Sequence, residues 1–483
     1  MHLRRSLGLD LPEEEHTQMT RESFNEFRQF GALRGRRSPK RIGLVLNHCF
    51  IGLLGFFSSV SIRFIGELYV TEICFIGLLP FLFLLRWRRL ATPELKRVFA
   101  LLGLWLLNQL ITDAYRQTEL QDRMRGAAGI LVFGAELACL AILLGRSNSR
   151  KVVFFTAFAT GLLVMARLRP GELVEDDPWK FGYAMGTIEL AILISSFFYA
   201  RRRYVPALAV LAAIISVNLL QNYRSAVLEI LVTAVLVFPL IPDRIGKLRI
   251  LPRKGNPLRV VVVVTLAMIG GWSAGKLVGL VSQSGIVSSE AQEKNESEAR
   301  AGSLLFGGRP EFFVGLRAAA ESPLIGYGSW PRDMRFIELQ NDLMQEYGLK
   351  VDLKDIEAEE RGLIPTHSHV VGAWVWAGIL GATFWVYVLW LMVRGILRVS
   401  IVRPVLAPLL CWLMIVLFWD TLFSPFGSFE RMYAALTIVI AVDLLDSSPT
   451  SASGDLPRPS RRWTRRAWRR SVPLRSVAGA QGS

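Results

Sequence analysis

The chain has 483 residues, of which 52% are hydrophobic, and a formal net charge of +16. A soluble protein of this length is ordinarily less apolar, so the composition excludes that class and favours an integral membrane protein. The positive charge would suit nucleic acid or an anionic membrane surface, and its placement along the chain decides between them.

Apolar runs recur along the chain, each bounded by arginines and loop residues. We predict about twelve membrane spans, because the runs have the length of about 17 to 25 residues that crosses a bilayer core. The sequence therefore predicts an all-α polytopic membrane domain over 43–446. Its spans are expected near 43–61, 65–85, 97–113, 126–145, 151–168, 181–200, 204–221, 225–241, 259–281, 369–393, 404–421 and 430–446.

The polar tail 1–42 contains no apolar signal-peptide core, so the first span is expected to be the insertion signal and the tail to stay cytoplasmic. The short basic loops "RWRR", "RRR" and "PRK" then all fall on the cytoplasmic side, as the positive-inside rule requires. The tail 447–483 contains "PRPSRRWTRRAWRRS" and is expected to be a disordered cytoplasmic segment on the membrane surface. Topology and membrane lipids thus explain the basicity, and no nucleic-acid partner is predicted.

One large extramembrane element is expected, the loop 282–366 between the ninth and tenth spans. A loop of this length inside a compact domain is usually functional. Its middle part predicts a short amphipathic helix beginning at Pro310 and then a Pro/Gly turn, and its end predicts one or two further helices.

Three patches on the predicted outer side carry chemistry: Arg224 in "QNYRS", Arg309 in "GGRPEFF", and His367 and His369 in "THSH". Taken singly, each has a structural explanation: a boundary arginine, a loop arginine or a packed polar cap. Taken together, two guanidinium groups suit a diphosphate, and a histidine can take a proton from a hydroxyl nucleophile. The cysteines and histidines show no metal-binding spacing, so neither a metal nor a cofactor is predicted.

Carboxylates within the apolar runs give a competing signal, because intramembrane acids often mark proton or ion paths. They could instead pair with arginines and hold helices together, and the sequence leaves both explanations open. They are Glu67, Glu72, Glu136, Glu189 and Glu229.

Two of the patches match a family pattern in detail. "NYRSAVLEILVTA" has Arg224 in a turn after a middle span, with Ser225 where the pattern has glycine. "GGRPEFFVGLRAAAESPLIGYGSW" has Gly-Arg, a short helix and a Pro-Leu-x-Gly-x-Gly turn. The turn supplies Pro323, Gly326 and Gly328.

The third patch, "HSHVVGAWVWAGILG", has His367, then Ser368 in place of the usual asparagine, and glycines at 378 and 381. This register favours His367 as the family histidine, with His369 as an addition. Over about 205–395 the chain therefore resembles the bacterial O-antigen ligase and polymerase superfamily.

The resemblance implies an inverting, metal-independent glycosyl transfer from undecaprenyl diphosphate to an acceptor hydroxyl, at the periplasmic face of the bacterial inner membrane. It implies that His367 activates or orients the acceptor hydroxyl, while Arg224 and Arg309 bind the diphosphate and stabilise its growing charge. Further contacts to the diphosphate or the sugar are expected from His369, Trp330, Gly326 and Gly328.

The acceptor stays open. A ligase would use a lipid A core sugar, and an O-antigen or exopolysaccharide polymerase would use a second lipid-linked glycan. A protein hydroxyl is the third possible acceptor. A lipid-linked glycan flippase or a proton-coupled transporter is the alternative from a different class, because it would also have about twelve spans and buried acids.

Overall fold

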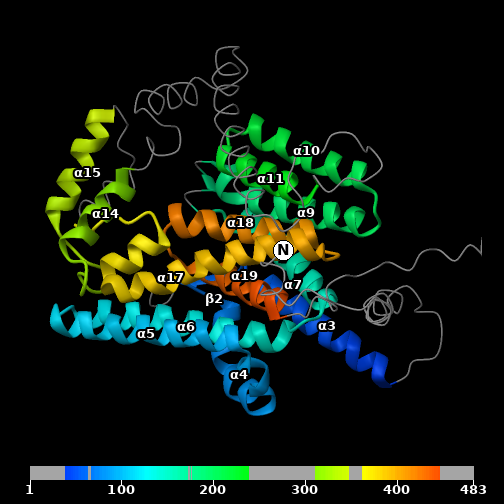
Figure 1. The fold of residues 1–483 in the computed structure, drawn as a ribbon, viewed down its shortest axis with the longest axis horizontal. Helices are drawn as coiled ribbons and strands as arrows, with labels where there is room; N and C mark the ends of the chain where they lie inside the picture. Colours follow the sequence, from blue (N-terminus) through cyan, green and yellow to red (C-terminus); the bar gives the residue numbers. More distant parts are fainter. Residues whose placement is uncertain are drawn as a thin grey trace, which may run out of the picture. The chain divides into compact units, whose positions relative to one another are not determined.

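A computed structural model describes residues 39–63, 67–171, 174–175, 177–238, 310–347 and 362–446 (Figure 1). Several predicted features lie outside the described residues: residues 1–38 of the N-terminal tail, the C-terminal tail, the ninth span at 259–281, and the first part of the loop at 282–309, which includes Arg309.

Helices make up most of the described chain, which agrees with the all-α prediction. A small antiparallel hairpin is an addition to it, pairing Ser61 with Tyr69 and Arg63 with Glu67, so the predicted span at 65–85 begins as a strand. The elements are α3 (Pro39–Phe57), β1 (Ser61–Arg63), β2 (Glu67–Tyr69), α4 (Val70–Arg86), η2 (Trp87–Ala91), α5 (Pro93–Tyr115), α6 (Leu120–Leu144), α7 (Asn148–Leu168), η3 (Pro178–Tyr183), α9 (Ala184–Ala200), α10 (Tyr204–Leu220), α11 (Arg224–Val237), α14 (Pro310–Glu321), α15 (Met334–Tyr347), α17 (His369–Val402), α18 (Ala407–Phe423) and α19 (Ser428–Asp446).

Several helices have the length and composition of membrane spans. Within the described residues, six are long and apolar enough to cross a bilayer: Val70–Ala91, Pro93–Tyr115, Leu120–Leu144, Asn148–Leu168, Pro178–Ala200 and His369–Ser400. Large apolar side chains on them face outward, and Leu84 and Leu85 are each 78% exposed. Such exposure is unfavourable in water and favourable in lipid, so the chain is a membrane protein.

Local sequence explains where the spans begin. Thr92 caps α5 by accepting a hydrogen bond from the Leu95 amide, and Pro93 occupies the first helical position, where its missing N–H costs nothing. Ser147 caps α7 in the same way through the Arg150 amide. The helices then pack in pairs, with α17 against α5 and α18, α3 against α7, and α9 against α10 (Figure 1).

An aromatic cluster lies where α5, α6 and α17 meet. The Phe133 and Trp385 rings stack with centroids 5.9 Å apart, and Trp105 contacts both Phe384 and Trp385. Phe426, from the loop between α18 and α19, closes the cluster at 4.9 Å from Trp385. These large apolar rings fix the position of α17 within the helix bundle.

α17 does not run straight, although the sequence predicted a simple span at 369–393. Gly378 has φ 65° and ψ −168° and interrupts the helix. The rings of His369 and Trp385 lie 4.7 Å apart, whereas a straight helix would separate these residues by roughly 24 Å. The entry segment (residues 369–377) therefore folds back against the long segment (residues 379–402). The predicted span thus keeps its apolar length, and the structure adds a break within it, because a glycine with positive φ allows a reversal that apolar composition does not reveal.

Candidate functional site

The break in α17 is covered by the docking turn (residues 322–329), which lies between α14 and α15. The Tyr327 amide donates to the Val375 carbonyl at 2.7 Å, and the Gly328 amide donates to the Trp376 carbonyl at 3.0 Å. A helix end leaves such carbonyls without partners inside the helix. The turn thus supplies the hydrogen bonds that the end of the entry segment lacks.

The other side of the break is satisfied in the same way. The Ile379 amide, first in the long segment, donates to the Pro323 carbonyl at 2.9 Å, and the Trp374 indole donates to the same oxygen. The Asn108 side-chain amide of α5 donates to the Ala377 carbonyl. Both ends created by the break are therefore bonded to the docking turn or to α5.

The motif glycines serve this close approach. Gly326 has φ 81°, and a Cβ atom there would lie 2.7 Å from the Gly378 nitrogen. Gly328 has φ 92°, and a Cβ atom there would lie 3.0 Å from a carboxylate oxygen of Asp113. Gly381 lets the entry segment pack against the long segment, because a Cβ atom there would lie 2.8 Å from the Cβ of Ala377. The structure therefore gives Gly326 and Gly328 a packing role.

The C-terminal part of α5 holds the docking turn through a polar stripe that the sequence analysis missed. Asp113 accepts hydrogen bonds from the Ser329 amide at 2.6 Å and the Ser329 hydroxyl at 2.8 Å. Arg116 donates to the Gly326 carbonyl, and Thr112 donates to the Ile325 carbonyl. The stripe was detectable in "NQLITDAYR", where polar residues recur at helical spacing inside an apolar run.

Tyr327, in the centre of the turn, lies beside a positive charge. The Arg116 guanidinium carbon lies 5.1 Å from the centroid of the Tyr327 ring. Burial raises the pKa of the Tyr327 phenol above its ordinary value, so the group stays neutral at physiological pH.

The opposite end of the entry segment holds the two histidines. His367 is exposed, whereas His369 is 1% exposed and lies among aromatic rings, including Trp385 and Phe426. Ser368, between them, is the N-cap: its hydroxyl accepts a hydrogen bond from the Val371 amide and donates to the Thr421 carbonyl of α18. Serine and asparagine are both good N-caps.

α14 lies beside this entry. It begins at Pro310, as the sequence predicted. The Phe312 ring lies 6.1 Å from that of Phe423 at the end of α18. Gly315 packs so closely that a Cβ atom there would lie 2.9 Å from Val371. The same added Cβ would lie 3.2 Å from the Pro365 carbonyl, two residues before His367. α14, whose first residue follows Arg309 in the chain, thus contacts α17 (Figure 1).

Arg224 is the first residue of α11 and is half-buried. α11 packs against α18 and, less extensively, against α17. The Thr421 carbonyl of α18 accepts the hydrogen bond of Ser368. The helix that begins at Arg224 therefore packs against the helix to which the entry segment is bonded. Asp420 was not considered from the sequence, where it is one acid within an apolar run.

Trp330 follows the docking turn with φ 52° and is 38% exposed. Its ring centroid lies 5.6 Å from that of Trp376 in the entry segment. Nearby, Arg332 forms an ion pair with Asp122 at the start of α6, with 2.9 Å between nitrogen and oxygen. Trp330 thus belongs to the docked loop, with part of its ring available for an aromatic contact.

The acids in the spans differ in their surroundings. Glu72 is buried and forms an ion pair with Arg431 at 2.8 Å, so it holds α4 and α19 together. The backbone carbonyl of Glu67, an exposed residue, accepts a hydrogen bond from Ser428. Among the described residues, Glu136 and Glu189 are fully buried and have carboxylates with no hydrogen-bond partner. Glu229 is 9% exposed.

Comparison with known proteins gives no match: no protein-family model matches the chain, and neither does any curated protein. Within the residues that the structure describes, no group of three or more His, Cys, Asp or Glu side chains has a metal-binding arrangement.

Proposed function

We propose that the chain is a glycosyltransferase that moves a glycan from a polyprenyl-diphosphate carrier, undecaprenyl diphosphate in bacteria, to an acceptor hydroxyl. The reaction would occur at the periplasmic face of the inner membrane. The observation that carries the proposal is the exposed His367, directly before the capped N-terminus of the entry segment in a broken membrane helix. Helix N-termini favour anions, and broken membrane helices often direct such termini at anionic substrate groups.

Each step can be assigned to a residue of this chain. The acceptor oxygen attacks the anomeric carbon from the face opposite the diphosphate, and the bond from that carbon to the phosphate oxygen breaks. A ring nitrogen of His367 takes the proton of the acceptor hydroxyl. Arg224 and Arg309 bind the departing diphosphate, whose negative charge grows as the bond lengthens.

The other residues proposed for substrate contact fit this scheme unequally. We assign the base to His367 because it is exposed, whereas His369 is enclosed by aromatic rings and is suited to positioning the entry segment. Trp330 offers an exposed indole on which a sugar face can stack. We take a lipid A core sugar as the acceptor, which makes the enzyme a ligase.

A transporter is the second candidate function. Two observations favour it: the broken helix α17, and the buried carboxylates of Glu136 and Glu189. Proton-coupled transporters combine these features. Such a protein would move a lipid-linked glycan or a proton across the bilayer without forming a new glycosidic bond.

Reconstitution of the purified full chain in proteoliposomes tests both functions. With a synthetic polyprenyl-diphosphate glycan and an acceptor, wild type should release the carrier diphosphate and extend the acceptor. His367→Gln should slow transfer by about 10²- to 10⁴-fold, the usual contribution of a general base. His48→Gln in α3, where the buried ring is bonded to Ser149 of α7, controls for the loss of a histidine away from the site and should retain transfer if its unfolding temperature is unchanged.

Full transfer by His367→Gln would contradict the assigned base. Movement of the donor between leaflets without any transfer by wild type would favour the transporter. If wild type extends one lipid-linked glycan with another and leaves a lipid A core acceptor unchanged, the enzyme is a polymerase.

A further inference from the structure

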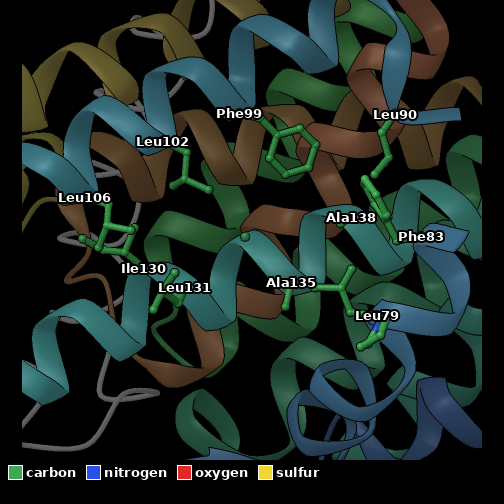
Figure 2. Close-up of a pocket in the computed structure, with 13 residues that line it drawn as sticks. Leu79, Phe83, Leu90, Phe99, Leu102, Leu106, Ile130, Leu131, Ala135 and Ala138 are labelled. Carbon is green, nitrogen blue, oxygen red and sulfur yellow. The ribbon is translucent and has the colours of Figure 1, made fainter. Parts of the chain in front are cut away.

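An apolar groove lies between α4, α5 and α6, and no step of the proposed reaction uses it. Its volume is about 640 Å³, and every residue that lines it is apolar or a glycine (Figure 2). The lining side chains offer water no hydrogen-bond partner. The surrounding helices have the length and composition of membrane spans. A hydrocarbon chain is the chemical class that fits.

Small residues create the space. A Cβ atom added at Gly103 of α5 would meet no heavy atom within 4 Å, and one added at Gly134 of α6 would meet Leu102 at 3.1 Å. Larger side chains form the sides, and Phe83 and Leu131 are 52% and 58% exposed (Figure 2). The groove is therefore open laterally, toward the position of the membrane lipids.

One end of the groove meets a basic, aromatic segment. Leu90, which lines the groove, belongs to η2, together with Trp87 and Arg88. Arg86 ends α4, and both arginine side chains are exposed. Tryptophan and arginine at the end of a span are typical of the headgroup level, where arginine attracts anionic lipid.

The length of the groove fits one leaflet. Along α4, Leu79 lies roughly 10 Å from Arg86, and along α6, Leu131 lies roughly 20 Å from the helix end at Leu144, at about 1.5 Å per residue. Half of a bilayer core is about 15 Å thick. A chain that enters at the arginines would therefore reach about the middle of the membrane.

We propose that this groove binds an acyl chain of an anionic phospholipid, whose phosphate contacts Arg86 and Arg88. The positive-inside rule assigns this basic end, and therefore the lipid, to the cytoplasmic leaflet. The proposal does not depend on glycosyl transfer, because it rests on the groove and the adjacent charges alone.

Native mass spectrometry of the delipidated full chain tests the groove. Phosphatidylglycerol and phosphatidylethanolamine with identical acyl chains are the probes, and wild type should retain one phosphatidylglycerol preferentially. Gly103→Leu fills the groove and should weaken this binding about tenfold, a change of about 1.4 kcal/mol. Gly77→Leu on α4 is the matched control, because its added Cβ also meets nothing within 4 Å and Gly77 does not line the groove.

The arginines are tested separately, in a variant that carries both Arg86→Gln and Arg88→Gln. Its preference for phosphatidylglycerol over phosphatidylethanolamine should fall by about 30-fold for the pair, since each arginine near the surface contributes about fivefold toward anionic lipid. These side chains are exposed, so the variant should fold even if Gly103→Leu does not.

Equal retention by Gly103→Leu and Gly77→Leu would overturn the proposal. So would equal binding of the two phospholipids by wild type. Displacement of phosphatidylglycerol by an equal amount of undecaprenyl phosphate would assign the groove to the carrier lipid, and would also overturn it.

Discussion

The two ends of the entry segment differ in their surroundings: one is held by hydrogen bonds, and the other presents an exposed histidine. At its C-terminal end, the carbonyls of Val375, Trp376 and Ala377 each accept a hydrogen bond from the docking turn or from α5. At its N-terminal end, His367 is exposed in front of the Ser368 cap. Where the backbone depends on tight pairing, substitution should impair folding, whereas an exposed imidazole can be changed without that cost. Motif residues in one short segment can therefore have unrelated roles.

Substitution of Gly378 should have the largest effect on this comparison. In Gly378→Ala, a non-glycine residue would have φ 65°, and its Cβ would overlap the Leu324 carbonyl of the docking turn. We expect a loss of about 3 kcal/mol or more in the free energy of unfolding, measured by thermal unfolding of the purified protein in detergent. Gly372→Ala in the same segment is the control, because its Cβ would meet Thr366 at an ordinary 3.4 Å. Equal stability of the two variants would contradict tight packing of the docking turn against the C-terminal end of the entry segment.

The two histidines should give the next largest contrast. His369→Ala removes a ring that is buried against Trp385 and Phe426, and we expect a loss of about 2 to 4 kcal/mol from the cavity that it leaves. His367→Ala should lower the unfolding temperature less, because the side chain is exposed. Thermal unfolding of both variants beside wild type checks this pair. A lower unfolding temperature for His367→Ala than for His369→Ala would reverse the assignment of the two ends.

The cap at Ser368 should show the smallest effect. Ser368→Ala removes one acceptor for the Val371 amide and one donor to the Thr421 carbonyl, and should cost about 1 to 2 kcal/mol. Ser368→Asn should lose less, since asparagine also caps helices. Ser400→Ala, near the other end of α17, controls for the loss of a hydroxyl. If Ser368→Asn unfolds at a lower temperature than Ser368→Ala, the capping explanation fails.

The sequence predicted the apolar helical character of the chain and a helix in 310–321, because both depend on local patterns. Of the twelve predicted spans, six correspond to described helices that are long and apolar enough to cross a bilayer. The reversal at Gly378 could not be predicted in the same way, because the entry segment and the long segment have the same apolar composition. The break depends on the docking turn, which is distant in sequence. Its hydrogen bonds replace the helix hydrogen bonds that are lost at the break.

The polar stripe on α5 is an intermediate case. Asn108, Thr112 and Arg116 recur at the spacing of one helix face, so a partner for that face was predictable. Its identity was not, because Ile325 and Gly326 lie far along the chain and offer only backbone carbonyls. For the candidate site, the sequence favoured His367 over His369 by register, and exposure is the property that only the structure adds.

The docking turn has a consequence for how pieces of such proteins can be exchanged. The carbonyls at the break in α17 cannot be left unpaired in hydrocarbon, so the turn must accompany any helix that carries Gly378. Asp113 and Arg116 also hold the docking turn against α5 through hydrogen bonds. A chimera that takes its extramembrane loop from another protein would therefore need the matching face of α5 and the matching glycine as well. The docking turn, although it lies outside the predicted spans, therefore has to be exchanged together with α5 and α17.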